Sequence, residues 1–148
     1  MSTPRHPIHI GPATFYQGNA RSQAEWEEAV KQLLNEGQAF LAYDLAQMGL
    51  HQFTDSLKLK QTAARALDKT GALEEAQKIL EPLLKIAPDE ETIGLLGRVY
   101  KDLWKRSGNP DDARCSLDTY RRGFEATGGY YTGINAAAME WLVGDKEI

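Results

Sequence analysis

The residues of this chain repeat at an interval of about 34 positions, and this interval restricts the fold more than any other feature of the sequence. A five-residue step from a glycine to an alanine occurs three times, at Gly37 and Ala42, Gly71 and Ala76, and Gly108 and Ala113. Such intervals are typical of arrays in which one supersecondary unit stacks on the next. No segment alternates cleanly between apolar and polar residues, so helices are favoured over strands. The sequence therefore predicts a helical repeat protein.

The order of residues inside each interval resembles the tetratricopeptide repeat, whose pattern is W-x2-L-G-x2-Y…A-x3-F…P. The run from Leu96 to Tyr100 reads L-G-x2-Y, and Ala76, Leu80 and Pro88 match the second half of the pattern. This resemblance implies an all-α fold, a right-handed α-solenoid of antiparallel helix pairs with about seven helices. We expect its units near residues 23–56, 57–89 and 90–127, with a partial unit at 128–148.

Several residues mark the expected helix boundaries and crossings. Ser22 and Glu25 have the spacing of a capping box. The three glycines of the repeated step lie at the expected turns, where a left-handed residue ends a helix at little cost. Gly97 and Ala113 remove side-chain bulk, which lets neighbouring helices cross closely. Pro82 lies inside an otherwise helical run and predicts either a kink or an early end of that helix.

Two longer segments narrow the resemblance. The segments EETIGLLGRVYKDLW, residues 90–104, and YYTGINAAAMEWLVGD, residues 130–145, are similar to the TRAFs-binding domain of apoptosis signal-regulating kinases, which lies in their central regulatory region, and of bacterial relatives. The resemblance covers roughly residues 24–145, and AYDLAQMGL at residues 42–50 is a weaker third match. It implies a helical interaction module that regulates an attached or associated enzyme. The resemblance does not imply that TRAF proteins bind this chain, because the chain contains no motif that would identify them as its partner.

The length and composition are those of one domain, which we place at residues 22–148. The preceding arm, residues 1–21, contains three prolines, and we expect it to be flexible. With a net charge of -4, the chain has no overall basic field that would attract nucleic acid or an anionic membrane. No apolar run approaches the roughly 18 residues of a membrane helix. A single cysteine suits a reducing cytosol. We therefore expect a cytoplasmic protein that binds neither nucleic acid nor membrane.

The sequence contains no set of residues that indicates catalysis. His6 and His9 have a spacing found in metal sites, but Pro7 opposes the helix that would bring them together. Cys115 has no histidine nearby in the sequence, so we interpret it as a packed or half-exposed thiol. We interpret Tyr130 and Tyr131 as helix packing. The sequence thus predicts no enzyme activity, no metal site and no cofactor.

Cationic residues recur on one face of the first helix of each unit. At about 100° per residue, this face is the one that lines the concave groove of stacked repeats. Six cations lie on it, against four acids, which leaves a surplus of two positive charges. The cations are Lys31, Lys58, Arg65, Lys69, Arg98 and Lys101, and the acids are Glu27, Asp68, Glu91 and Asp102. The hypothesis is that these cations bind an acidic or carboxylate-bearing peptide; the alternative is a solvated face with an internal Arg65–Asp68 ion pair.

The partial fourth unit leaves an apolar stripe whose usual partner helix is missing. This stripe consists of Ile134, Ala138, Met139 and Leu142, with Trp141 as an anchor beside it. Repeat arrays need a polar capping helix at each end. Three explanations are open: the helix caps the array, the sequence is part of a longer chain, or the stripe pairs with a second copy.

These observations favour one function over its competitors. The leading hypothesis is a regulatory protein-interaction scaffold, part of a signalling protein, with a protein or peptide partner in its concave groove. The alternative is a homo-oligomerisation element that forms a homodimer through the C-terminal helix. A small-molecule sensor or an enzyme has little support, because no convergent set of polar residues appears in the sequence.

Overall fold

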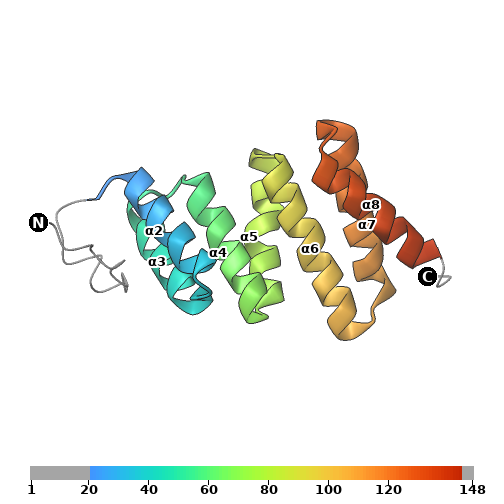
Figure 1. Ribbon diagram of the computed structural model, residues 1–148, viewed down its shortest axis with the longest axis horizontal. Helices are drawn as coiled ribbons and strands as arrows, with labels where there is room; N and C mark the ends of the chain where they lie inside the picture. Colours follow the sequence, from blue (N-terminus) through green and yellow to red (C-terminus); the bar gives the residue numbers. More distant parts are fainter. Residues whose placement is uncertain (1–20, 145–148) are drawn as a thin grey trace, which may run out of the picture.

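The computed structural model describes residues 21–144, and these form seven α-helices without a strand (Figure 1). The expected arm at residues 1–21 lies outside the described residues except for Arg21. The helices are α2 (Gln23–Asn35), α3 (Ala39–Gln52), α4 (Leu57–Thr70), α5 (Leu73–Ile86), α6 (Glu90–Ser107), α7 (Pro110–Thr127) and α8 (Tyr130–Gly144).

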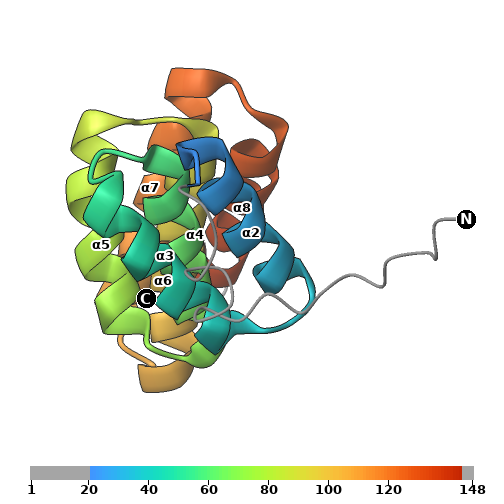
Figure 2. The same cartoon turned by 90° about the vertical axis from the view of Figure 1, so that its left-hand side faces the viewer.

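Consecutive helices pack side by side and form an elongated array of two layers (Figure 1). One layer holds α2, α4, α6 and α8, each of which contacts the next one in the layer. The other layer holds α3, α5 and α7, whose backbones contact their neighbours in the first layer but not one another. In Figure 2, α5 lies toward the left and α2 and α8 toward the right of the molecule. The predicted all-α solenoid of antiparallel helix pairs is confirmed.

The core is built from apolar side chains and from the small residues that the repeat predicts. Ala42, Ala76 and Ala113, the alanines of the five-residue step, are each 0% exposed. Their small side chains let the second helix of each unit lie close to its neighbours, while Trp26, Leu80 and other large residues fill the remaining space. Three contiguous clusters of such residues follow one another along the array.

At Gly97, α6 and α7 approach each other closely. A Cβ atom at this position would lie 2.7 Å from Cε1 of Tyr120, whose ring is 1% exposed. The Ser116 hydroxyl donates to the Gly97 carbonyl at 2.8 Å. The predicted close crossing at Gly97 is therefore confirmed, and a buried tyrosine fills the space that the missing side chain leaves.

The turn glycines behave as the sequence predicts. Gly37, Gly71 and Gly108 have φ of +80°, +85° and +71°, the left-handed region that ends a helix. The capping box of Ser22 and Glu25 is also present. The early end of a helix at Pro82 is wrong, because α5 continues through this residue to Ile86. Leu80 and Leu83 on either side of the proline are buried, and this packing offsets the backbone hydrogen bond that proline cannot make.

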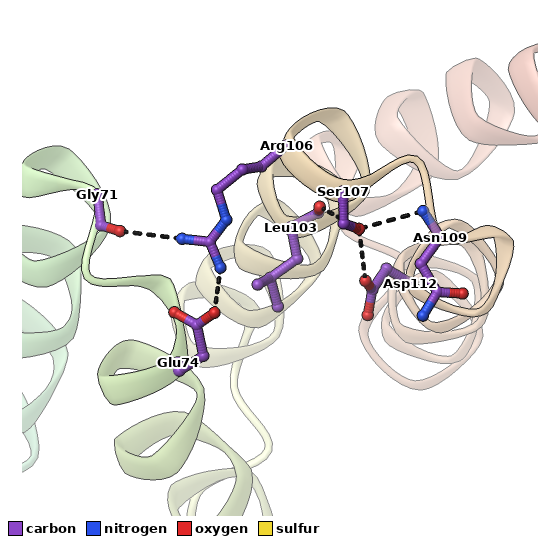
Figure 3. Close-up of polar contacts among 7 residues, drawn as sticks. All are labelled: Gly71, Glu74, Leu103, Arg106, Ser107, Asn109 and Asp112. Atoms are coloured by element: carbon purple, nitrogen blue, oxygen red, sulfur yellow. Dashed lines mark hydrogen bonds and ion pairs between the residues drawn. The ribbon is translucent and has the colours of Figure 1, made fainter.

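The junction between the second and third units is fastened by polar contacts at the end of α6 (Figure 3). Arg106 donates to the Gly71 carbonyl at 3.4 Å and pairs with Glu74 at the start of α5. The hydroxyl of Ser107 accepts a hydrogen bond from the backbone amide of Asn109 at 3.1 Å, one residue before the start of α7. These contacts hold α6 in register with α5 and α7, and so help to position the groove described next.

Candidate ligand-binding groove

Three adjoining pockets run along the layer of α2, α4, α6 and α8, and together we call them the inner groove. Their volumes are about 450, 310 and 220 Å³. The first pocket lies between α2 and α4, the second among α4, α6 and α8, and the third between α6 and α8. Arg65 and Glu91 border both the first and the second pocket, and Arg98 and Tyr131 border both the second and the third. The groove is therefore continuous.

The structure brings five of the six candidate cations to this groove. Lys31, Lys58 and Arg65 line the first pocket, and Arg98 and Lys101 line the third. The side chain of Lys69 is exposed on α4 but lines none of the three pockets. Glu28, Glu90 and Lys105 line the groove although the sequence reasoning did not include them.

These additions change the predicted charge of the groove. Six cations and five carboxylates line the three pockets, so the surplus is one positive charge where the sequence predicted two. The side chain of Asp68, which the sequence placed in the groove, is instead 3% exposed and lines none of the pockets. The net charge of the groove therefore favours an acidic ligand only slightly. The positions of the individual cations favour it more.

The three cations of the first pocket have no ion pair among the described residues. Lys31, Lys58 and Arg65 all face the same cavity, together with Glu27, Glu28 and Glu91. Of these carboxylates, Glu27 accepts a hydrogen bond from the Ser56 hydroxyl at 2.8 Å. Arg65 does not form the intrahelical pair with Asp68 that was considered as the alternative, because Asp68 points to α6.

Arg98 has a different environment from the cations of the first pocket. Its Nε lies 3.2 Å from Oδ2 of Asp68 on α4 and 3.9 Å from Oδ2 of Asp102, one turn along α6. Oδ1 of Asp68 is buried and has no hydrogen-bond partner. Burial raises the pKa of Asp68 to about 7, and the neighbouring carboxyl group of Asp102 adds to this effect, while Arg98 and Lys69 oppose it. Arg98 therefore neutralises carboxylates of the protein itself.

Tyrosines form the wall at the α8 end of the groove. The ring of Tyr131 lies over Gly94, where a Cβ atom would be 2.7 Å from Cε1 of the ring. Tyr131 also makes an edge-to-face contact with Tyr120 at a centroid distance of 6.3 Å. Tyr131 thus packs as the sequence predicted, but Tyr130 is 83% exposed and the packing interpretation is wrong for that residue. The sequence reasoning missed Tyr131 as a groove residue; the missing side chain at Gly94 was the available signal.

Glu90 fixes the start of α8 against α6 and so sets the shape of this end of the groove. Its carboxylate accepts a hydrogen bond from the Thr127 hydroxyl at 2.7 Å and another from the Thr132 amide in the first turn of α8 at 3.0 Å. These hydrogen bonds hold the pKa of Glu90 below its ordinary value. A carboxylate at a helix N-terminus is also favoured by the helix dipole.

The residues predicted for a terminal interface on α8 do not share one surface. Ile134 and Trp141 are 49% and 68% exposed, whereas Ala138 and Leu142 are half-buried. Met139 is 0% exposed and packs in the cluster of α7 and α8. The predicted exposure is therefore wrong for Met139, because α7 covers that face of α8. The exposed stripe consists instead of Tyr130, Ile134, Ala137 and Trp141.

The side chains with chemical reactivity are placed apart from one another. Cys115 lies at the surface of α7. Partial desolvation of its thiol, together with the neighbouring acids, raises the pKa of the thiol and so disfavours the reactive thiolate. Among residues 21–144, no three histidine, cysteine or acidic side chains are grouped so that they could hold a metal ion. His6 and His9 lie outside the described residues. None of the described helices has the length and apolar character needed to cross a membrane.

Comparison with known proteins places this architecture among tetratricopeptide-repeat proteins. The family described as Tetratricopeptide Repeats-Sensor matches residues 25–140. Mitogen-activated protein kinase kinase kinase 15 of Mus musculus is 32% identical over an alignment of 99 residues, which covers 62% of this chain. The matched region is only 7% of the length of that kinase.

Solved structures with the same fold differ widely from this chain in sequence. The TPR domain of Sgt2 from Aspergillus fumigatus superposes with a TM-score of 0.74 at 15% identity, over 86% of this chain and 83% of that domain. A thermophilic TPR protein from Thermus thermophilus superposes with a TM-score of 0.76, also at 15% identity, over 85% of this chain and 68% of that protein. At this identity the likeness concerns the fold alone.

Proposed function

We propose that this chain, which belongs to the Tetratricopeptide Repeats-Sensor family, is a regulatory protein-interaction module whose inner groove binds an acidic peptide segment. The family match and the kinase relative confirm the predicted tetratricopeptide domain of the apoptosis signal-regulating kinase type. Domains of this architecture are suited to holding partner segments, because stacked units create one extended surface.

The observation that supports an acidic segment is the first pocket of the inner groove. Three cations from two helices, Lys31, Lys58 and Arg65, face one cavity of about 450 Å³, and none of them is used in an ion pair among the described residues. Unpaired cations that converge on a cavity are suited to charge-assisted hydrogen bonds with carboxylates. Glu28 and Glu91 at the border of the same pocket repel acids that are out of register, and they would thereby add specificity.

The regulatory part of the proposal rests on the kinase relative. The chain corresponds to 7% of that protein, so the module occupies a small region of a much larger signalling enzyme there. By analogy, we propose that occupancy of the inner groove controls an enzyme that is attached to this module or associated with it, and that the module itself catalyses no reaction.

The proposal is tested by measuring the binding of an acidic peptide to the full chain. The probe is a dye-labelled twelve-residue peptide with four glutamates and a free C-terminus, followed by fluorescence polarisation at low salt. Reversing two cations of the first pocket, with Lys31→Glu and Arg65→Glu together, should weaken binding about a hundredfold or more, because each charge-assisted contact contributes about 1.5–3 kcal/mol.

Lys69→Glu is the matched control, since this lysine is exposed on the same helix as Arg65 but lines none of the groove pockets. It should change binding by less than about twofold. A peptide with glutamines in place of the glutamates should bind weakly. Equal binding of both peptides, or unchanged binding by the double variant, would remove the acidic segment from the proposal.

A second candidate function is homo-oligomerisation through α8. The exposed stripe of Tyr130, Ile134, Ala137 and Trp141 favours it, because these residues recur at steps of four, three and four along the helix. Light scattering across a concentration range distinguishes the two functions. A dimer that dissociates on Ile134→Glu with Trp141→Glu supports the second candidate, and a monomer at all concentrations excludes it.

A further inference from the structure

A cavity of about 810 Å³ lies between α5 and α7, on the opposite layer from the inner groove, and we call it the outer groove. It is larger than any of the three pockets of the inner groove. It exists because the backbones of α5 and α7 do not contact each other, so that the α6 residues Leu96 and Tyr100 form its floor. The outer groove has no role in the function proposed above.

The two walls of the outer groove are formed by equivalent positions of two repeat units. Counted from Ala76 on α5 and Ala113 on α7, the residues at steps of two, five, six and nine line the cavity on both helices. They are Lys78, Glu81, Pro82 and Lys85 on α5, and Cys115, Asp118, Thr119 and Arg122 on α7. Each wall therefore presents two helical turns, about 10.5 Å of helix at 1.5 Å per residue.

The α5 wall offers apolar surface to a partner. Ile86 is 77% exposed, Pro82 is exposed one turn before it, and Leu84 is half-buried. The floor residue Leu96 is 2% exposed. An exposed isoleucine beside a concave apolar floor is typical of a surface that becomes buried on association.

Some charged residues around the outer groove have a partner within the chain, and others have no ion pair. Glu81 accepts a hydrogen bond from the Tyr100 hydroxyl at 2.5 Å, and Asp118 forms an ion pair with Arg122 at 3.1 Å. Burial raises the pKa of Tyr100 well above its ordinary value, so this phenol keeps its proton and remains a donor. Lys78 and Lys85 have no ion pair among the described residues. The α5 wall thus carries two unpaired ammonium groups seven residues apart.

We propose that the outer groove is a second docking surface, and that it takes an amphipathic helix of a protein partner with two acidic residues seven positions apart along one flank of its apolar stripe. On a helix, two acids at that interval are about 10.5 Å apart, which is the spacing of the two lysines on α5. The partner's apolar stripe would cover Pro82 and Ile86.

A helix fits this site better than an extended segment. The described residues around the groove belong to helices whose backbone groups are already hydrogen-bonded, so no strand edge is available to pair with an extended peptide. A helix satisfies its own backbone hydrogen bonds and needs only side-chain contacts. Two walls of helical ridges with a trough between them also match the ridges of a third helix.

The test uses the full chain and a designed helical peptide. The probe is an eighteen-residue alanine-based peptide with a leucine stripe and two glutamates seven positions apart on one flank; a second peptide has lysines in place of the glutamates. Binding is measured by isothermal titration calorimetry, and the alkylation rate of Cys115, the chain's single cysteine, reports whether the peptide occupies the outer groove.

The expected result is binding of the glutamate peptide, slower alkylation of Cys115, and about tenfold weaker binding to a variant with Lys78→Glu and Lys85→Glu. The lysine peptide should recover this affinity with the same variant. Ile86→Ser should also weaken binding without a loss of helical circular dichroism, because the side chain is 77% exposed.

The matched control is the chain with Lys31→Glu and Arg65→Glu, which should bind the glutamate helix as the unchanged chain does, whatever happens to the unstructured acidic peptide. The outcome of this test is therefore independent of the inner groove. The proposal is overturned if the glutamate peptide fails to bind, if both peptides bind alike, or if binding leaves the alkylation of Cys115 unchanged. It is also overturned if light scattering shows a dimer of the chain in which the alkylation of Cys115 is slowed without any peptide, since a second copy would then occupy this surface.

Discussion

Cations at the two ends of the inner groove differ in whether they are paired with acidic residues of the chain itself. At the α2 and α4 end, Lys31, Lys58 and Arg65 face a cavity without an ion pair among the described residues. At the α6 end, Arg98 lies at the repeat position of Lys31 and Arg65, but it is paired with Asp68 and Asp102. The position within a repeat thus determines which face a cation lies on, while the neighbouring unit determines whether its charge is available to a ligand.

The cause of the difference is the residue at one core position. Leu34 of the first unit and Asp68 of the second are 34 residues apart, and both are buried. A leucine there needs no partner, whereas a carboxylate is costly to bury unless it is paired or protonated. The ion pair with Arg98 and the raised pKa of Asp68 meet this requirement, and the α6 end of the groove loses a free cation as a result.

The largest effect is expected from Arg98→Gln compared with Arg65→Gln. Removing Arg98 leaves Asp68 buried without its cation, so at pH 8 the variant should lose about 3 kcal/mol of unfolding free energy. Arg65→Gln should cost less than about 0.5 kcal/mol, because Arg65 has no ion pair to lose among the residues that the structure describes. Chemical denaturation of both variants measures these costs, and equal costs would mean that the two ends of the groove do not differ.

A somewhat smaller effect is expected on the pH dependence of the unfolding free energy. Because burial raises the pKa of Asp68 in the folded chain from its ordinary 3.8 to about 7, the folded state binds more protons than the unfolded state between these values. The unfolding free energy should therefore fall as the pH rises from about 4 to about 7, by an amount on the order of 2 kcal/mol, and level off above that. Urea denaturation at several pH values measures the slope.

Asp68→Asn is the control for the pH effect, since asparagine has the same shape and does not titrate. Its stability should vary less over this window. The cost of Arg98→Gln should also be smaller at pH 5.5 than at pH 8, because a protonated Asp68 needs no cation. A wild-type stability that rises between pH 5 and pH 7 would contradict the raised pKa of Asp68.

Features that repeat within the sequence could be predicted, whereas features that depend on a contact between units could not. The period placed the turns at Gly37, Gly71 and Gly108, because the requirement for a left-handed residue is local. The pairing of Arg98 with Asp68 joins residues of different helices, and spacing along the chain does not reveal it. For the same reason the burial of Met139 was missed, since it depends on how α7 covers α8. The residues of the outer groove recur at equivalent repeat positions, but the gap between α5 and α7 that makes them a cavity depends on how the units stack.

Within the α6 end, the smallest difference is expected between Gly97→Ala and Gly94→Ala. Both changes add one methyl group to the same helix and gain a similar helix propensity, about 1 kcal/mol. At both sites the new Cβ would lie 2.7 Å from a tyrosine ring, Tyr120 for Gly97 and Tyr131 for Gly94. Tyr120 is 1% exposed and cannot move, whereas Tyr131 is 48% exposed and can turn toward solvent.

Gly97→Ala should therefore destabilise the chain by about 1.5 kcal/mol, since overpacking in a core outweighs the gain in helix propensity. Gly94→Ala should leave stability unchanged or slightly higher, but it should shift the Tyr131 ring and alter the second pocket of the groove. Thermal unfolding measures the first effect, and the near-ultraviolet circular dichroism of tyrosine reports the second. If the two variants were equally stable, the α6 end would be less tightly packed than its buried tyrosine indicates.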